Sequence, residues 1–144
     1  MYMTFEQYMK DVIQPMRDEL TGIGFTELLT PEDVEEQFAA ATGTALVVVN
    51  SVCGCAAGLC RPGVAQALKA TGHAPDQLFT VFAGQEREAT AKAREYFAPY
   101  PPSSPSIALM KDGQLVHMVE RHQIENRSAE EISAELQRAF AEFC

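Results

Sequence analysis

The sequence has little positive charge. Its 144 residues include 11 Lys and Arg against 20 Asp and Glu, which gives a formal net charge of −9 at pH 7. Nucleic-acid binding needs a basic surface that displaces the counterions of the phosphates, and the few basic residues here are scattered along the chain. Anionic lipid also attracts clusters of basic residues. The charge balance therefore excludes nucleic acid and the membrane surface from the expected partners.

Long hydrophobic runs are also lacking. No apolar stretch approaches the length of about 20 residues that crosses a bilayer, and residues 1–10 have neither the basic start nor the apolar stretch of a secretory signal. We therefore expect a cytoplasmic protein. Thiols are kept reduced in that compartment, so the four cysteines are not expected to form a structural disulfide framework. They are better interpreted as redox-active, metal-binding or buried residues.

The composition is otherwise that of an ordinary globular domain. Hydrophobic residues make up 47% of the chain and charged residues 22%. A chain of this length suits one domain and buries a sizeable core without covalent staples. No internal repeat, low-complexity tract or long linker divides the sequence. We therefore expect residues 1–144 to form a single domain.

The local patterns alternate between helix and strand. Apolar spacing of the 3.6-residue type, capping residues and Gly or Pro boundaries predict helices at about 4–20, 30–42, 55–70, 85–97 and from 128 onward. Continuous apolar or β-branched runs predict strands at 45–50, 78–82, 107–110 and 115–119. The last two strands flank Asp112-Gly113, which is a strong signal for a hairpin turn.

This order of elements indicates the fold class. Strands that are separated by helices pair in parallel, whereas a hairpin adds an antiparallel strand. The sequence therefore predicts an α/β fold of the thioredoxin-like pattern. We expect a mixed four-stranded sheet with helices on both faces and an extra N-terminal helix.

Two of the cysteines lie where a strand gives way to a helix. Cys53 and Cys55 follow the strand at 45–50 and begin the helix at 55–70. A helix N-terminus carries about half a positive charge and free N–H groups. Both favour the thiolate, which is the nucleophilic form of cysteine, so this is the place for a cysteine of lowered pKa. Arg61, on the same predicted helix, is a candidate source of further positive field.

The spacing of this pair is tighter than the Cys-x-x-Cys of typical thioredoxins. A disulfide that spans Gly54 closes a small strained ring, and strain raises the reduction potential of the bond. Glycine is the residue that best tolerates the backbone distortion. A Cys53–Cys55 bridge would suit isomerisation, or release of a mixed disulfide, better than strong reduction.

A proline-rich loop at 99–105 precedes the strand at 107–110. Thioredoxin-like proteins carry a cis proline at this place, facing the active cysteine, and X-Pro bonds are the only common cis peptides. We expect a cis Ser104–Pro105 bond, whose backbone groups would pair with an extended substrate chain. The alternative interpretation of this loop is a polyproline ligand.

Several stretches resemble the bacilliredoxins, a bacterial family of thioredoxin-like proteins. The most specific is Ser-Val-Cys-Gly-Cys-Ala-Ala-Gly at 51–58, inside a longer similarity over 46–59. The other similar stretches are 8–22, 81–85, 88–92, 102–106, Arg121-His122 and Cys144. The resemblance covers essentially the whole chain. It departs at Cys60, where the family usually has a small residue such as Ala.

This resemblance implies an activity. Bacilliredoxins remove bacillithiol, a low-molecular-weight thiol, from S-bacillithiolated client proteins, and the family has been linked to weak disulfide isomerase activity. Carried over to this chain, Cys53 attacks and takes bacillithiol as a mixed disulfide, which Cys55 or free bacillithiol then resolves. Gly54, Ser104 and Pro105 would contact the substrate. Bacillithiol is then a co-substrate, and no bound organic cofactor or metal is implied.

Two further cysteines are candidate auxiliary residues. Cys60 lies two helical turns beyond Cys53, roughly 10 Å along the axis, which is too far for a direct bridge without movement. The favoured interpretation is a small buried hydrophobe, although Cys60 could be oxidised in a flexible or substrate-bound state. Cys144 ends the chain, where exposure is common, although the terminal carboxylate disfavours its thiolate. It is a candidate resolving thiol or dimer contact.

Three other functions remain open from the sequence. The nearest is a general disulfide isomerase or reductase that uses another small thiol. A protein of a different class would bind soft Cu(I), or Zn(II) with a histidine, through Cys-x-Cys and a third cysteine. Structural zinc sites usually show two short Cys or His pairs, however, and this chain has one. The third is a catalytically idle interaction module on the same fold.

Overall fold

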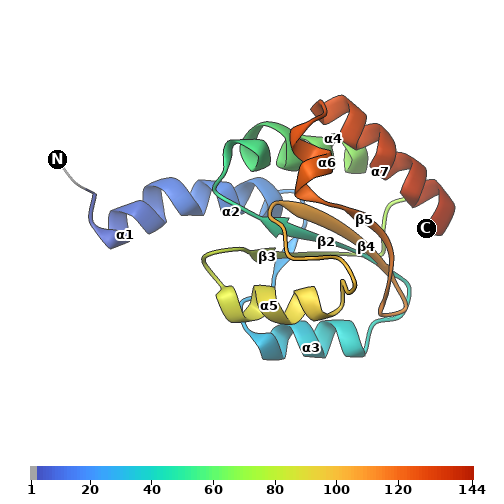
Figure 1. The fold of residues 1–144 in the computed structure, drawn as a ribbon, viewed down its shortest axis with the longest axis horizontal. Coiled ribbons are helices and arrows are strands. Elements are labelled where there is room, and N and C mark those ends of the chain that lie inside the picture. The colour runs from blue at the N-terminus through green and yellow to red at the C-terminus, as the bar shows by residue number, and fades with distance from the viewer. Residues whose placement is uncertain (1–2) are drawn as a thin grey trace.

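The computed structural model describes residues 3–144 (Figure 1). The chain begins with one continuous helical stretch, formed by α1 (Phe5–Tyr8), the π-helical turn η1 (Met9–Ile13) and α2 (Gln14–Thr21). Thr4 and Gln7 cap its start reciprocally, each side chain accepting a hydrogen bond from the other's backbone N–H. Figure 1 shows α1 extending away from the rest of the molecule. The predicted N-terminal helix is thereby confirmed.

Five strands form one mixed sheet: β1 (Thr26–Glu27), β2 (Thr44–Asn50), β3 (Gln77–Phe82), β4 (Ser106–Lys111) and β5 (Gln114–Val119). Their order across the sheet is β1-β3-β2-β4-β5. The pairs β1–β3 and β2–β3 are parallel, whereas β2–β4 and β4–β5 are antiparallel. The mixed pairing that the sequence predicts is confirmed, with β2 in the middle of the sheet.

The predicted number of four strands was wrong by one, because β1 adds a fifth. Thr26 and Glu27 lie beside Phe79 and Thr80 of β3. The backbone N–H of Leu28 then donates to the carbonyl of Thr80 at 2.9 Å. Two residues are too few to show the alternation that reveals a strand in a sequence, so only pairing with β3 defines this element.

Helices cover both faces of the sheet (Figure 1). They are α4 (Arg61–Ala70) and α7 (Ala129–Phe143) on one face, and α3 (Pro31–Ala39) and α5 (Arg87–Glu95) on the other. Every residue of β2 is buried, and its side chains alternate between two hydrophobic clusters. Leu46 and Val48 belong to the cluster under α4 and α7, whereas Val47 and Val49 belong to the cluster over α3 and α5.

The β4–β5 hairpin closes as its sequence predicts. Asp112 and Gly113 both have positive φ, 51° and 78°, as a two-residue turn of the I′ type requires. The turn is tied to the chain just before β2, because the Asp112 carboxylate accepts from the N–H of Gly43 at 2.7 Å. The hairpin therefore fixes β4 against β2.

One helix, α6 (Arg121–Glu125), is absent from the sequence prediction. It begins directly after β5, where Glu120 and Gln123 form a reciprocal capping box. Five residues are too short for helical periodicity, which explains why the apolar pattern does not reveal it. Across residues 3–144, no helix has the length and apolar character that a membrane span requires.

Candidate functional site

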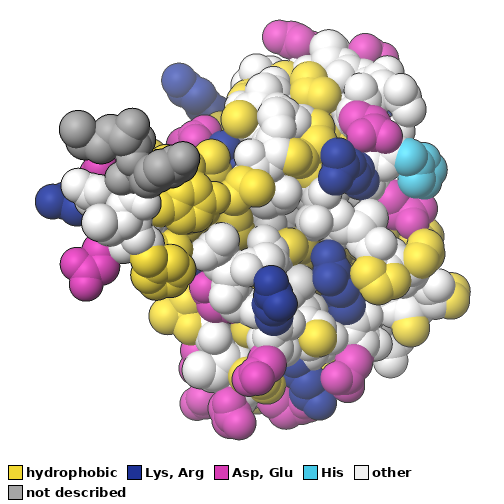
Figure 2. Space-filling view, turned by 60° about the vertical axis from the view of Figure 1, so that its left-hand side comes forward, with side chains coloured by type: hydrophobic (Ala, Val, Ile, Leu, Met, Phe, Trp, Pro, Cys, Tyr) yellow, Lys and Arg dark blue, Asp and Glu magenta, His cyan; other side chains and the backbone are white. Residues whose placement is uncertain are grey.

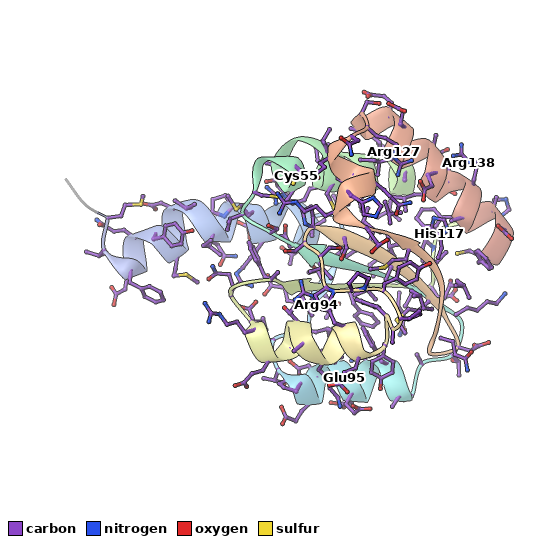
Figure 3. All side chains as sticks on the ribbon, in the orientation of Figure 1. Cys55, Arg94, Glu95, His117, Arg127 and Arg138 are labelled. Carbon is purple, nitrogen blue, oxygen red and sulfur yellow. The ribbon has the colours of Figure 1, made fainter. Side chains whose placement is uncertain are left out.

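Cys53 and Cys55 lie at the end of the central strand. The chain leaves β2 at Asn50, turns at 51–53 and enters a helix that continues through η2 (Ala56–Cys60) into α4. The carbonyl of Cys53 accepts from the N–H groups of Ala56 and Ala57 at 3.1 and 3.2 Å. Cys53 therefore stands at the start of the helix, as the sequence predicts, and Figure 3 shows Cys55 in the same turn.

The two thiols have different acidities. Burial on its own would raise the pKa of Cys53, but hydrogen bonds from Cys55, from Ser51 and from the backbone N–H groups of Ala56 and Cys55 lower it on balance. These donors stabilise the thiolate more than burial disfavours it. Cys53 is therefore the thiol that loses its proton first.

Cys55 responds in the opposite direction. Its pKa is raised by burial, by its hydrogen bond to Cys53 and by the negative charge of the Cys53 thiolate, while the positive charge of Arg121 acts to lower it. In the reduced protein, Cys55 thus keeps its proton and donates it toward Cys53. Once Cys53 is bound in a disulfide its negative charge is gone, and the thiolate of Cys55 becomes easier to form.

A buried polar network holds the turn that carries Cys53. Arg61 has an exposed fraction of only 2%, and its Nη1 donates to the side-chain oxygen of Asn50 at 2.8 Å and to the carbonyl of Ser51 at 3.0 Å. Its Nε lies 3.2 Å from a carboxylate oxygen of Glu19. Ser51 in turn accepts from the N–H of Cys53 at 3.3 Å. Arg61 thus supports the turn, and it is absent from the groups that set the Cys53 pKa.

The proline loop contains the expected cis bond. The Ser104–Pro105 peptide bond is cis, and so is Ala98–Pro99, which the sequence does not single out. Pro105 is buried at the start of β4. The carbonyl of Ser103, two residues before Pro105, accepts from Arg94 Nη2 at 3.3 Å and from the Ser106 hydroxyl at 3.1 Å. Contacts from α5 and β4 therefore fix the chain that leads into Pro105.

Arg121 connects the proline loop with the cysteines. Its backbone N–H donates to the Ser103 hydroxyl at 3.3 Å, and its Nη1 donates to the carbonyl of Ser104 at 3.1 Å. Its charge interacts with both Cys53 and Cys55, and α6 lies against η2. In the sequence, Arg121 stands out only as part of the resemblance to the bacilliredoxins. The Glu120 and Gln123 capping pair was the signal that could have placed it at a helix start.

Arg121 links the Ser104 carbonyl to the charge environment of Cys53 and Cys55, whereas the other two cysteines have no such link within the described part of the chain. Cys60 is fully buried beneath the site, and burial raises the pKa of its thiol to about 12. Cys144 is exposed, and Figure 1 shows the C-terminus at the other end of the sheet from the turn after β2. Auxiliary roles for these two residues therefore stay predictions.

Gly54 has open space around it. A Cβ placed on Gly54 meets no atom within 4 Å, and its φ lies outside the left-handed region. We therefore expect Gly54→Ala to change the free energy of unfolding of the reduced protein by less than about 1 kcal/mol. If glycine is needed only to close the Cys53–Cys55 ring, the same variant will form that disulfide more slowly. Thermal unfolding and disulfide titration measure the two effects, and a large loss of stability in the reduced state would contradict this interpretation.

Metal binding receives no support from the side-chain arrangement. Within the part of the chain that the structure describes, no group of three or more His, Cys, Asp or Glu side chains is placed to hold a metal ion. Cys60 lies in the hydrophobic cluster under α4 and α7, so it does not complete a set with Cys53 and Cys55.

Structural comparison identifies the fold. Thioredoxin from Fasciola hepatica matches 83% of this chain and 100% of its own, with a TM-score of 0.56 and 21% sequence identity. Mitochondrial thioredoxin 3 from Saccharomyces cerevisiae matches 86% of this chain and 98% of its own, with a TM-score of 0.54 and 16% identity. At these identities the similarity establishes the thioredoxin fold, as the sequence predicts.

Sequence comparison identifies the family. A family model described as Disulphide isomerase matches residues 8–144. A bacilliredoxin of Halalkalibacterium halodurans is 57% identical over 144 residues, and one of Geobacillus kaustophilus is 53% identical over 144 residues. Both alignments cover 100% of this chain and 99% of the relative.

Fold, cysteine pair and relatives together define a thiol–disulfide oxidoreductase of the thioredoxin fold. Within that class, the chain belongs to the bacilliredoxin family.

Proposed function

We propose that this protein removes bacillithiol from S-bacillithiolated client proteins in the cytoplasm, with Cys53 as the attacking residue. The observation that carries the proposal is the division of roles between neighbouring thiols. The pKa of Cys53 is lowered while that of Cys55 is raised. One thiol is therefore ready to attack, and the other keeps its proton until the first has reacted. The choice of bacillithiol as the small thiol is based on the similarity to bacilliredoxins.

The reaction is a pair of thiol–disulfide exchanges. The Cys53 thiolate attacks the bacillithiol sulfur of the client's mixed disulfide. The old S–S bond breaks, its electron pair leaves with the client sulfur, and a Cys53–bacillithiol disulfide forms. Cys55 as thiolate then attacks the Cys53 sulfur, and bacillithiol leaves with the electron pair of the broken S–S bond. Alternatively, a second bacillithiol attacks the bacillithiol sulfur, which releases the Cys53 thiolate and forms bacillithiol disulfide. Attack by Cys55 leaves a Cys53–Cys55 disulfide, which an external thiol must reduce.

The proline loop would orient the client in this reaction. In our proposal, the backbone around Ser104 and Pro105 pairs with the client chain, and Gly54 leaves the approach to Cys53 open. Cys53 and Cys55 are partly exposed and Gly54 is exposed, so a client reaches them at the surface. Exposed Val52, which has 46% of its surface accessible, offers an apolar contact beside the sulfur.

Mass spectrometry of the reaction products tests this function. The reduced protein is mixed with a bacillithiol-modified client, and the adduct is mapped by peptide analysis. We expect the bacillithiol mass on Cys53 and release of the unmodified client. Cys144→Ser serves as the matched control, because it removes an exposed thiol away from the site and should leave the transfer unchanged. A client that retains its adduct would overturn the proposal.

A general disulfide isomerase is the second candidate, and it is supported by the description of the family model as Disulphide isomerase. This candidate acts on protein disulfides and needs no small-thiol adduct. A scrambled disulfide protein that regains its native pairing, with no transfer from the modified client, would favour it over removal of bacillithiol.

A further inference from the structure

A positive charge stands beside the two reactive sulfurs. Arg121 interacts electrostatically with both Cys53 and Cys55. Its charge acts to lower the pKa of Cys55, although burial and Cys53 raise that pKa on balance. Arg61, the other arginine near the turn, is buried and committed to Asn50 and Ser51. Arg121 is therefore the arginine that an incoming substrate meets at the cysteines.

The side chain of Arg121 is held in place, but its guanidinium keeps a nitrogen that is free to donate further hydrogen bonds. Nη1 donates to the carbonyl of Ser104, and Nε donates to Glu125 at 3.3 Å. Among the residues that the structure describes, none accepts a hydrogen bond from Nη2. The side chain retains 46% exposure and that of Glu125 retains 44%, so their ion pair lies in solvent and is weak. The guanidinium can therefore accept a second anion.

The surroundings make this charge distinctive. The whole chain carries a formal charge of −9, which on its own would repel an anionic substrate. Figure 2 turns forward the side where β2 and β3 end, and Lys or Arg side chains lie over its middle while Asp and Glu lie along its lower edge and also at its top, left and right margins. The charge of Arg121 therefore offers an anion at the cysteines a local attraction that the overall charge of the protein does not.

We propose that Arg121 is the specificity-determining residue for the small thiol: its guanidinium binds a carboxylate of the thiol that is transferred to Cys53. This inference rests on the proposed function and adds to it the residue that selects an anionic over a neutral small thiol. Arg121 is anchored at Ser104 and acts electrostatically on both sulfurs, so a carboxylate of the thiol can contact it while the thiol's sulfur reacts with Cys53. The exchange chemistry is unchanged, since Arg121 transfers neither a proton nor an electron pair.

Three simple disulfides that differ in charge test the proposal. They are 3,3′-dithiodipropionate (anionic), bis(2-hydroxyethyl) disulfide (neutral) and cystamine (cationic). Each is reacted with full-length protein carrying Cys55→Ser, so that the Cys53 mixed disulfide accumulates. The ratio of the anionic to the neutral rate constant is the readout, because a merely structural role of Arg121 would change both rate constants alike.

We expect Arg121→Gln to lower that ratio roughly fivefold and to raise the cationic-to-neutral ratio. Arg121→Lys keeps the charge but loses the planar fork, so it should retain part of the preference. Arg138→Gln removes the same charge from the exposed face of α7, far from Cys55 in Figure 3, and should change neither ratio. An unchanged ratio in Arg121→Gln would overturn the inference.

Two further outcomes distinguish this inference from failure of the proposed function and from binding of the client by Arg121. If wild-type Cys53 takes no thiol from any of the three disulfides, the proposed function itself fails. If Arg121→Gln changes only the reaction with client peptides that carry Asp or Glu beside the modified cysteine, the guanidinium binds the client. That result would overturn the assignment to the small thiol.

Discussion

Replacing Cys53 by serine should abolish thiol transfer, with a fall in rate of at least about a thousandfold. A serine hydroxyl is not ionised near neutral pH, so the donors around residue 53 would have no thiolate to stabilise. These donors are Cys55, Ser51 and the N–H groups at the helix start. A stopped assay of client release, read by mass, measures the effect. Substantial transfer by Cys53→Ser would show that another cysteine attacks.

Cys55 supplies the matched comparison. Cys55→Ser keeps a hydroxyl donor next to Cys53, so the first exchange should proceed within a few-fold of wild type and the Cys53 adduct should accumulate. Cys55→Ala removes the donor, and the pKa of Cys53 should then lie above its value in Cys55→Ser. Thiolate absorbance against pH separates the two variants. Equal Cys53 pKa values would show that the side chain at residue 55 does not stabilise the thiolate.

Arg61→Met should destabilise the fold by about 2–3 kcal/mol, because it leaves buried acceptors on Asn50 and Ser51 without their donor. For a chain of this size, that loss lowers the melting temperature by roughly 5–10 °C. The turn that carries Cys53 also loses its support, so we expect the pKa of Cys53 to rise. Thermal unfolding and thiolate absorbance measure the two consequences.

Arg138→Met is the control for that experiment. It is the same substitution at an exposed position of α7, so the free energy of unfolding should stay within about 0.5 kcal/mol of wild type. If Arg61→Met were equally mild, solvent would be replacing the guanidinium, and the network around Ser51 would not be what positions Cys53.

The sequence predicted the elements that carry strong local signals. The apolar run of β2, the Asp112-Gly113 turn and the Ser128 capping box each appear where expected. It also placed Cys53 at a helix start and the cis bond before Pro105. These features depend on neighbours in the chain, so a single sequence contains the information for them.

The parts that the sequence did not show depend on contacts between distant segments. β1 exists because two residues pair with β3, and Arg121 reaches the site because Nη1 bonds to Ser104, 17 positions away. The direction of Arg61 is set by Asn50 and Ser51 from the preceding strand end. A periodicity argument has no access to such pairings, which is why the charge beside the cysteines emerged only from the structure.

The two hydrophobic clusters on either side of the sheet give the family unequal freedom to diverge. The cluster under α4 and α7 contains Cys60 and Val64, which lie on the helix that begins at Cys53, so substitutions there should disturb the turn. Among the described residues, the cluster over α3 and α5 includes none from that helix. Relatives should therefore vary in side-chain size at Phe38, Phe79 and Phe97 more often than at residues of the cluster under α4 and α7. The two faces of one sheet would then accumulate substitutions at different rates during evolution.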